Sequence, residues 1–164
     1  YLSLNNEELV NLKDEMDHIE NYMEIQTMRF PGQILFSCNV EEPLYACKIP
    51  MLMLQTFLEN AVKYGIDFSV PSPITLSAIS EERDGTDGIL FTITDCGEGF
   101  SEELLSFYQK DDLSVPSNQE HGIGIINVKK RLHLIYGGLE NISIENHLPS
   151  GAKIKIWIPK GEKK

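Results

Sequence analysis

The chain has 164 residues, of which 41% are hydrophobic and 24% charged, and this composition predicts a soluble globular domain with a core of its own. Its net charge of −11 argues against a nucleic acid as the main partner, because nucleic-acid binders normally present a basic face. No apolar run approaches the roughly 20 residues of a membrane span, and the start of the chain, at Tyr1 rather than Met, resembles no signal peptide and suggests a fragment of a longer protein.

Residues 5–30 are predicted to form one helix. Asn5 can cap its first turn, with Glu8 three positions later as in a capping box. Apolar side chains then recur every three or four residues, at Leu9, Leu12, Met16, Ile19 and Met23. A narrow seam of this kind indicates packing on a partner helix, and we expect the chain to expose this seam to a partner. A Pro-Gly pair ends the segment, and His18, which lies off the seam, is expected to face solvent.

The middle of the chain alternates between strand and helix patterns. Alternating apolar residues predict a half-buried strand over 34–40, and Pro50 is expected to open a helix that ends at Gly65. Two strand-like runs, 74–80 and 89–95, flank a pair of Asp-Gly turns, which is typical of a β-hairpin.

The last third of the chain predicts two helices, a loop and a second hairpin. The segments are a short helix over 101–110, a polar loop over 111–120, a helix over 122–138 and a hairpin of 140–146 with 152–159. Strands grouped mainly in antiparallel hairpins, with helices able to cover one face, predict an α+β fold built as a two-layer sandwich.

The helix that ends at Gly65 carries an acid, an amide and a base close together: Glu59, Asn60 and Lys63. One interpretation is a solvated face with an ion pair between Glu59 and Lys63, which would stabilise the helix by roughly 0.3 kcal/mol. The other is that these polar groups face a binding site. The helix alone does not decide between the two.

Two glycine-bearing stretches bear on that choice. "DCGEGF", residues 95–100, follows a predicted strand, and "HGIGI", residues 121–125, opens a predicted helix. Glycine lets backbone N–H groups approach a ligand closely, and a helix N-terminus adds free donors for an anion. Neither stretch fits the common nucleotide motifs, because 122–124 lacks a third glycine and no G-x-x-x-x-G-K-[ST] is present. Each alone is typical of an ordinary turn.

Taken in order, however, these stretches resemble the ATP-binding domain shared by histidine kinases, gyrase, Hsp90 and MutL. "ENAVKYG" resembles the N box of that superfamily, "DCGEG" the first glycine box and "HGIGI" the second. Residues 100–121 between the glycine boxes resemble the ATP lid. Since the lid segment has little apolar periodicity, we expect it to be mobile over 101–120 without nucleotide.

Three longer stretches narrow the resemblance to sensor histidine kinases of the LytS/YesM type: "ENYMEIQTMRF", "IPMLMLQTFLENAVKYG" and "GIGIINVKKRLHLIYG". The resemblance covers nearly the whole chain. It implies the GHKL (Bergerat) ATP-binding fold, with a mixed, mainly antiparallel sheet covered by helices on one face. It also implies a division into a helical linker, 1–31, and an ATP-binding catalytic domain, 32–164.

The resemblance implies that Glu59, Asn60 and Lys63 face a Mg-ATP pocket, and it implies a role for each polar box residue. Asn60 would ligate Mg²⁺ through its amide oxygen, which agrees with the preference of this ion for oxygen donors. Glu59 would orient the attacking group as a general base, and Lys63 would neutralise phosphate charge. Asp95 would accept a hydrogen bond from the adenine amino group and so select ATP over GTP.

The glycines of the boxes would act through the backbone, by allowing tight turns and by exposing N–H groups to the ligand. Gly97 and Gly99 would let the chain turn beneath the base. Gly122 and Gly124 would present N–H donors to the phosphates, with the lid closing over them.

Three positions depart from the family pattern. Cys96 stands where Asn is usual, Tyr64 where His is common, and Ala152 where Thr is expected. The missing Thr removes a hydrogen bond near Asp95, so a modest ATP affinity is expected. Cys96 is interpreted as a small residue that fits, in preference to a reactive thiol.

None of the histidines has the sequence context of a phosphoacceptor; they are His18, His121, His133 and His147. The chain is therefore expected to be a catalytic fragment that supplies the γ-phosphoryl group of Mg-ATP to a histidine on an upstream helical segment. The isolated chain should bind ATP but retain no phosphate. A response regulator, a homodimeric parent protein and a membrane anchor of that parent are further expectations from the resemblance.

Two alternatives remain open. A stand-alone serine kinase of the anti-sigma-factor type has the same boxes. The predicted helix over 5–30 disfavours it, because such a helix is typical of a linker from an upstream domain. A non-catalytic nucleotide-binding module is disfavoured by the intact Glu59 and Asn60 but favoured by Cys96 and Ala152, which depart from the family pattern. The 3 cysteines are odd in number and show no C-x-x-C spacing, which excludes a disulfide framework or a zinc site and favours a cytoplasmic domain.

Overall fold

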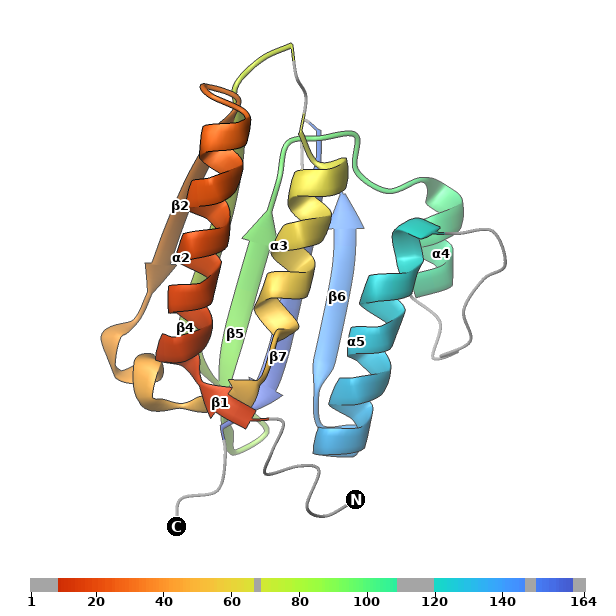
Figure 1. Cartoon of the computed structure of the whole chain (residues 1–164). Coiled ribbons are helices and arrows are strands. Elements are labelled where there is room, and N and C mark those ends of the chain that lie inside the picture. The colour runs from red at the N-terminus through yellow and green to blue at the C-terminus, as the bar shows by residue number, and fades with distance from the viewer. Residues whose placement is uncertain (1–8, 67–68, 109–119, 147–149, 161–164) are drawn as a thin grey trace.

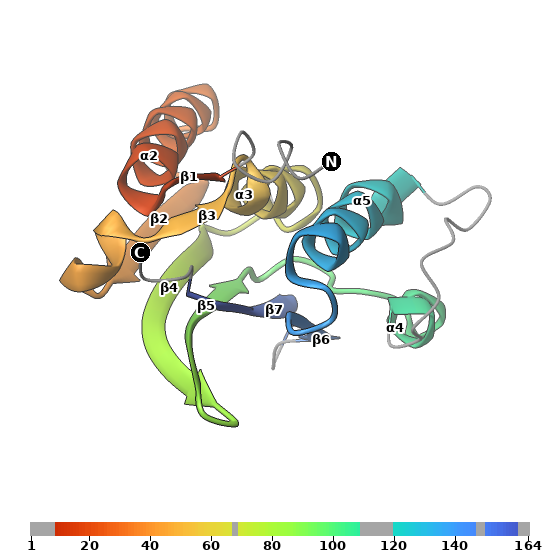
Figure 2. The same cartoon turned by 90° about the horizontal axis from the view of Figure 1, so that it is seen from below.

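The structure, a computed structural model, describes residues 9–66, 69–108, 120–146 and 150–160. The strands of its main sheet are β2 (Ile34–Val40), β4 (Ser72–Arg83), β5 (Thr86–Thr94), β6 (Asn141–Asn146) and β7 (Ala152–Pro159). The helices are α2 (Leu12–Arg29), α3 (Met53–Tyr64), α4 (Glu102–Tyr108), α5 (Glu120–Tyr136) and the 3₁₀ helix η1 (Glu42–Ala46). Helices α2, α3 and α5 cover one face of the sheet (Figures 1 and 2).

The main sheet has five strands in the order β2-β4-β5-β7-β6. Only β2 pairs in parallel, with β4, and the other pairs are antiparallel. The first hairpin turns at Asp84 and Gly85, which have φ of 50° and 80° as a two-residue hairpin turn requires. The predicted two-layer α+β sandwich and its mainly antiparallel sheet are confirmed.

The first helix begins later than predicted. Residues 9–11 form strand β1, which pairs antiparallel with β3 (Lys48–Pro50), so the helix starts at Leu12 and not at residue 5. Leu9 and Val10 lie opposite Pro50 and Ile49, and this pairing between distant segments overrides the local helical pattern. The proposed cap at Asn5 and Glu8 lies outside the described residues.

The apolar seam of α2 is buried within the same chain. Leu12, Met16, Ile19 and Met23 are at most 2% exposed and belong to one core with α3 and the sheet. The seam does pack on a helix, as predicted, and that helix is α3. The expectation of an exposed seam awaiting a further partner is therefore wrong, while the division of the chain at residue 31 stays a prediction. His18 is exposed, as expected.

The second helix also begins later than predicted. Pro50 ends strand β3, and α3 starts only at Met53 after Leu52, which adopts a left-handed conformation with φ 66°. From there the helix buries an apolar face against the sheet, made of Met53, Leu54, Phe57, Leu58 and Ala61.

The remaining elements follow the sequence pattern closely. Helix α4 and the second hairpin form as predicted, and α5 starts at Glu120, ahead of the predicted residue 122. Most of the predicted lid, 109–119, lies outside the described residues. Cys38, Cys47 and Cys96 form no disulfide. Within the described ranges, no helix combines the length and apolar character needed to cross a membrane.

Candidate nucleotide-binding site

A narrow cavity lies between α3 and the sheet, where β5 ends. Its polar lining comes from Asn60, Tyr64 and Asp95, and Phe57, Ile93 and Ile154 are among its apolar walls. Its free volume is about 20 Å³, which is room for about one water molecule. A nucleotide base would therefore enter only if the walls moved apart.

Asp95 is held at the floor of this cavity by the backbone around it. The residue follows β5 directly and is 8% exposed. Its Oδ1 accepts hydrogen bonds from the N–H groups of Gly97, at 3.0 Å, and Ala152, at 3.1 Å. Its own N–H donates to the carbonyl of Ala152 at 3.0 Å. These bonds fix the direction of the carboxylate, and they place position 152 beside it, as the family resemblance implies.

Glycines let three elements meet around Asp95. A Cβ at Gly65, the residue after α3, would lie 2.5 Å from Cγ of Asp95, and one at Gly97 would lie 2.5 Å from Cα of Gly65. Gly151 has φ +109°, and a Cβ there would overlap the Asp95 carbonyl. In the sequence Gly65 has the appearance of a helix stop and nothing marks Gly151, because close backbone approach leaves no pattern in one sequence.

Asn60 is a second polar residue of the cavity that could contact a ligand. It lies on the side of α3 that faces α5, and a Cβ on Gly124 would lie 4.0 Å from its amide nitrogen and oxygen. Its Nδ2 is buried and has no hydrogen-bond partner within the described part of the chain. Leaving such a group unsatisfied costs about 1 to 3 kcal/mol. A half-turn of the amide exchanges its nitrogen and oxygen, so the site suits either a donor or an acceptor at the ligand.

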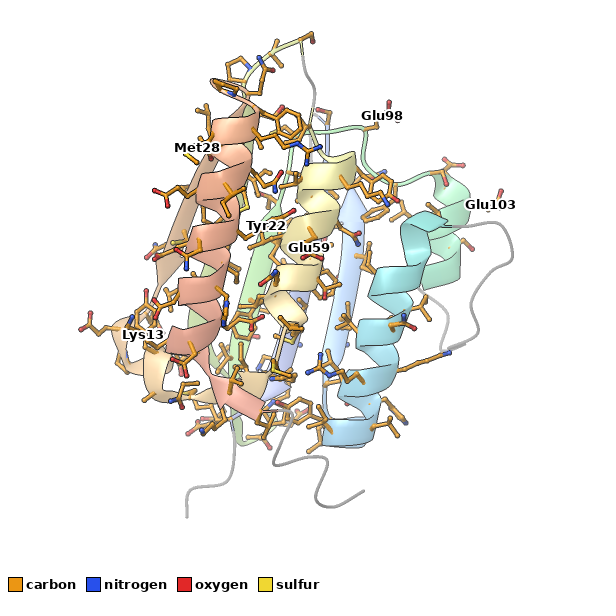
Figure 3. All side chains as sticks on the ribbon, in the orientation of Figure 1. Lys13, Tyr22, Met28, Glu59, Glu98 and Glu103 are labelled. Carbon is orange, nitrogen blue, oxygen red and sulfur yellow. The ribbon has the colours of Figure 1, made fainter. Side chains whose placement is uncertain are left out.

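Glu59 and Lys63 lie outside the cavity. Both are exposed; Glu59 accepts a hydrogen bond from Nε2 of Gln55 at 3.1 Å, and the Lys63 ammonium lies 5.3 Å from the centre of the Tyr64 ring. Between these two described residues, Glu59 and Lys63, no ion pair is formed. Figure 3 places Glu59 on the side of α3 turned away from the sheet, with Tyr22 of α2 nearby. Burial, and then the Glu59 carboxylate, raise the pKa of Tyr22.

Gly99 and Phe100, which line the cavity, are held in place by Asn146, a residue that no sequence pattern marks. Asn146, at the end of β6, accepts a hydrogen bond from the N–H of Phe100 at 2.7 Å and donates one to its carbonyl at 3.0 Å. Gly99, which lines the cavity, has φ +78° and leaves room for this amide. One Asn at a strand end is too common to be noticed in a sequence.

The structure thus brings together some of the predicted site residues and not others. Asn60, Asp95 and Gly99 line the cavity. Gly97 lies next to Asp95 and donates a hydrogen bond to it, and Gly124 lies opposite Asn60. Gly122 lies in the first turn of α5, and nothing more is described around it. Cys96 is half-buried, and its carbonyl accepts a hydrogen bond from the Ser150 hydroxyl at 3.3 Å.

Comparison with known proteins gives consistent matches along the chain. Residues 48–162 match the family of histidine kinase-, DNA gyrase B- and HSP90-like ATPases, and residues 1–34 match a histidine kinase family. The chain is 31% identical to the sensor protein LytS of Oceanobacillus iheyensis over 96% of its own length and 26% of that protein. It is 28% identical to the sensor histidine kinase YesM of Bacillus subtilis over 93% of its length and 24% of that protein. The chain thus spans about a quarter of these relatives.

Solved structures agree on the fold. The catalytic domain of the histidine kinase ThkA superposes with a TM-score of 0.64 at 16% identity, covering 93% of this chain and 94% of that domain. Full-length ShkA, solved in complex with AMPPNP, gives a TM-score of 0.64 at 18% identity over 94% of this chain and 31% of that protein. With the family match over residues 48–162, the chain belongs to the histidine kinase-, DNA gyrase B- and HSP90-like ATPases.

Proposed function

We propose that the chain binds Mg-ATP in this cavity and supplies the γ-phosphoryl group to a histidine on an upstream segment, in two-component signal transduction. The observation that carries the proposal is the pairing, in one cavity, of a fixed carboxylate at Asp95 with a buried amide nitrogen at Asn60 for which the described residues supply no hydrogen-bond partner. The similarity to LytS and YesM supports a sensor kinase as the parent protein, with a response regulator as its partner. A homodimeric, membrane-anchored parent with this domain in the cytoplasm belongs to the same proposal.

Asp95 would select the base. Its carboxylate is an acceptor only, and the adenine amino group is a donor. Guanine carries a carbonyl oxygen at the same ring position, which would face the carboxylate as a second acceptor. Because Oδ1 is held by Gly97 and Ala152, the carboxylate cannot easily turn to avoid this repulsion.

Asn60 would hold the metal and the phosphates. A bound Mg²⁺ would neutralise phosphate charge. Proteins usually hold this ion through few oxygen ligands of their own together with phosphate oxygens, and the amide oxygen of Asn60 would be one such ligand. Among the described residues no cluster of three or more carboxylate, histidine or cysteine side chains could hold a metal ion. Asn60 together with the phosphates is therefore the arrangement that we propose. Gly122 and Gly124, at the start of α5, would offer N–H donors to the same phosphates.

Glu59 would act on the incoming histidine. It is the exposed neighbour of Asn60, and its carboxylate is oriented by Gln55. An exposed base next to the metal ligand is accessible to a separate polypeptide segment, as transfer to an upstream histidine requires. Lys63, exposed on the same helix, would compensate phosphate charge. The ShkA structure with AMPPNP supports nucleotide binding by this fold.

Titration calorimetry with ATP and with GTP, both in excess Mg²⁺, tests the proposal. We expect ATP to bind and GTP to bind at least about tenfold more weakly, since one charged hydrogen bond is lost and a repulsion is gained. Equal affinities for the two nucleotides would show that Asp95 does not read the base. An absence of ATP binding would refute the proposed function as a whole.

A further inference from the structure

Glu15 of α2 is an acid in an unusual place. It is 1% exposed, although the rest of its helix carries its acids on the surface. Its Oε1 accepts a hydrogen bond from the N–H of Leu52 at 2.9 Å, and its Oε2 accepts from Leu54 at 3.1 Å and Gln55 at 3.2 Å. The carboxylate of one helix therefore caps the N-terminus of another.

The first turn of α3 depends on this cap. A helix start leaves N–H groups without partners, which a Ser, Thr, Asn or Asp normally satisfies from the cap position. Here the cap residue is Leu52, which makes no side-chain cap hydrogen bond and is held at φ 66°. The left-handed region is unfavourable for a leucine, so the conformation needs support from outside the segment. Glu15 supplies that support, and its negative charge also suits the positive end of the helix dipole.

The other end of α3 is fixed by a different part of the molecule. Gly65 packs directly on Gly97 and Asp95 at the end of β5. Helix α3 is thus attached to α2 at its N-terminus and to the base-binding end of the cavity at its C-terminus. Asn60 lies between the two attachments, and Asp95 lies at the second.

We propose that Glu15 is a positioning residue for the nucleotide site, which sets the place of Asn60 relative to Asp95 by tying α3 to α2. The proposal rests on the proposed Mg-ATP function and adds that α2 sets the position of Asn60 through its contact with α3. When the cap is lost, the start of α3 moves while its end stays packed on Asp95. Asn60 is then displaced from the metal and phosphates, but recognition of the base is kept. A displacement of α2 itself would reach the site by the same route.

The test compares Glu15→Gln with Glu20→Gln, the same change at an exposed position of the same helix. A glutamine at position 15 has one acceptor oxygen and brings an N–H₂ group towards backbone N–H donors. We expect Glu15→Gln to weaken Mg-ATP binding about tenfold, because Asn60 is displaced, and to leave adenosine binding within about twofold. Glu20→Gln should change neither. Calorimetry with Mg-ATP and with adenosine measures both quantities.

Hydrogen exchange provides a readout that does not depend on nucleotide. The amides of Leu54 and Gln55 should lose protection in Glu15→Gln and keep it in Glu20→Gln. Glu15→Asp, which keeps the charge on a shorter arm, should fall between wild type and Glu15→Gln in both experiments, and it replaces that variant if Glu15→Gln does not fold.

The outcomes separate the two proposals. Equal losses of Mg-ATP and adenosine affinity, or an unchanged Mg-ATP affinity, would overturn the positioning role of Glu15. If the wild-type chain bound no ATP, the proposed function would fail. The hydrogen exchange of the Leu54 and Gln55 amides would then be the remaining test of the cap that Glu15 forms on α3.

Discussion

Replacing Asn60 with alanine should lower the affinity for Mg-ATP about 100-fold and leave adenosine binding nearly unchanged, because only the metal-bound phosphates need the amide. The same change should not destabilise the nucleotide-free protein. It removes a buried Nδ2 that has no partner in the described part of the chain, so the free energy of unfolding should stay the same or rise by up to about 1 kcal/mol. Calorimetry with and without Mg²⁺, and thermal unfolding, measure the two effects.

Asn39→Ala is the matched control, since Asn39 is exposed on β2 at the far edge of the sheet. It should leave both nucleotide affinities unchanged. A large loss of stability in Asn60→Ala would mean that the amide holds the fold together. An equal loss of adenosine and Mg-ATP affinity would show that Asn60 shapes the whole cavity instead of the metal site.

Replacing Glu59 with alanine should reduce phosphoryl transfer to an added histidine-bearing upstream segment by about 100-fold or more, the usual contribution of a positioned base. Nucleotide affinity should change by less than about twofold, because such a base acts mainly in the transition state. Gln55→Ala should give a smaller loss of transfer, since Gln55 orients the carboxylate of Glu59. Incubation with radiolabelled ATP, followed by a test of acid lability, measures the transfer.

Glu82→Ala, a change at an exposed acid of β4, is the control and should transfer at the wild-type rate. Wild-type transfer by Glu59→Ala would refute the assigned role of Glu59. Acid-stable phosphate on a serine would favour the serine-kinase alternative. ATP binding by the wild-type chain without any transfer would favour a non-catalytic nucleotide-binding module.

Local patterns predicted most of the fold. Both hairpins follow from alternation and turn residues, and α5 from its apolar periodicity. The predicted start of α2 is wrong because Leu9 and Val10 pair with Pro50 and Ile49, respectively, about forty positions away. No local pattern contains such a pairing, and it decides whether these residues are strand or helix.

The candidate site was predictable only in part. The sequence singles out Asn60, Asp95 and the box glycines because their spacing resembles a known family. Glu15 was not found, because it is separated from its first partner by 37 residues and in sequence is one acid among many on a polar helix. Asn146 and Gly65 were missed for a related reason: their importance comes from a neighbour in space, Phe100 for one and Asp95 for the other.

In the proposed function, Asp95 and Asn60 hold the two ends of one nucleotide. A crystal structure of the chain with Mg²⁺ and a non-hydrolysable ATP analogue tests this most directly. We expect the cavity to be wider, with Gly99 and Phe100 moved away from α3. The adenine amino group should donate a hydrogen bond to Asp95, and the metal should be bound to the Asn60 amide oxygen. Nucleotide bound elsewhere on the chain, or in this cavity with its phosphates pointing away from Asn60, would contradict the account.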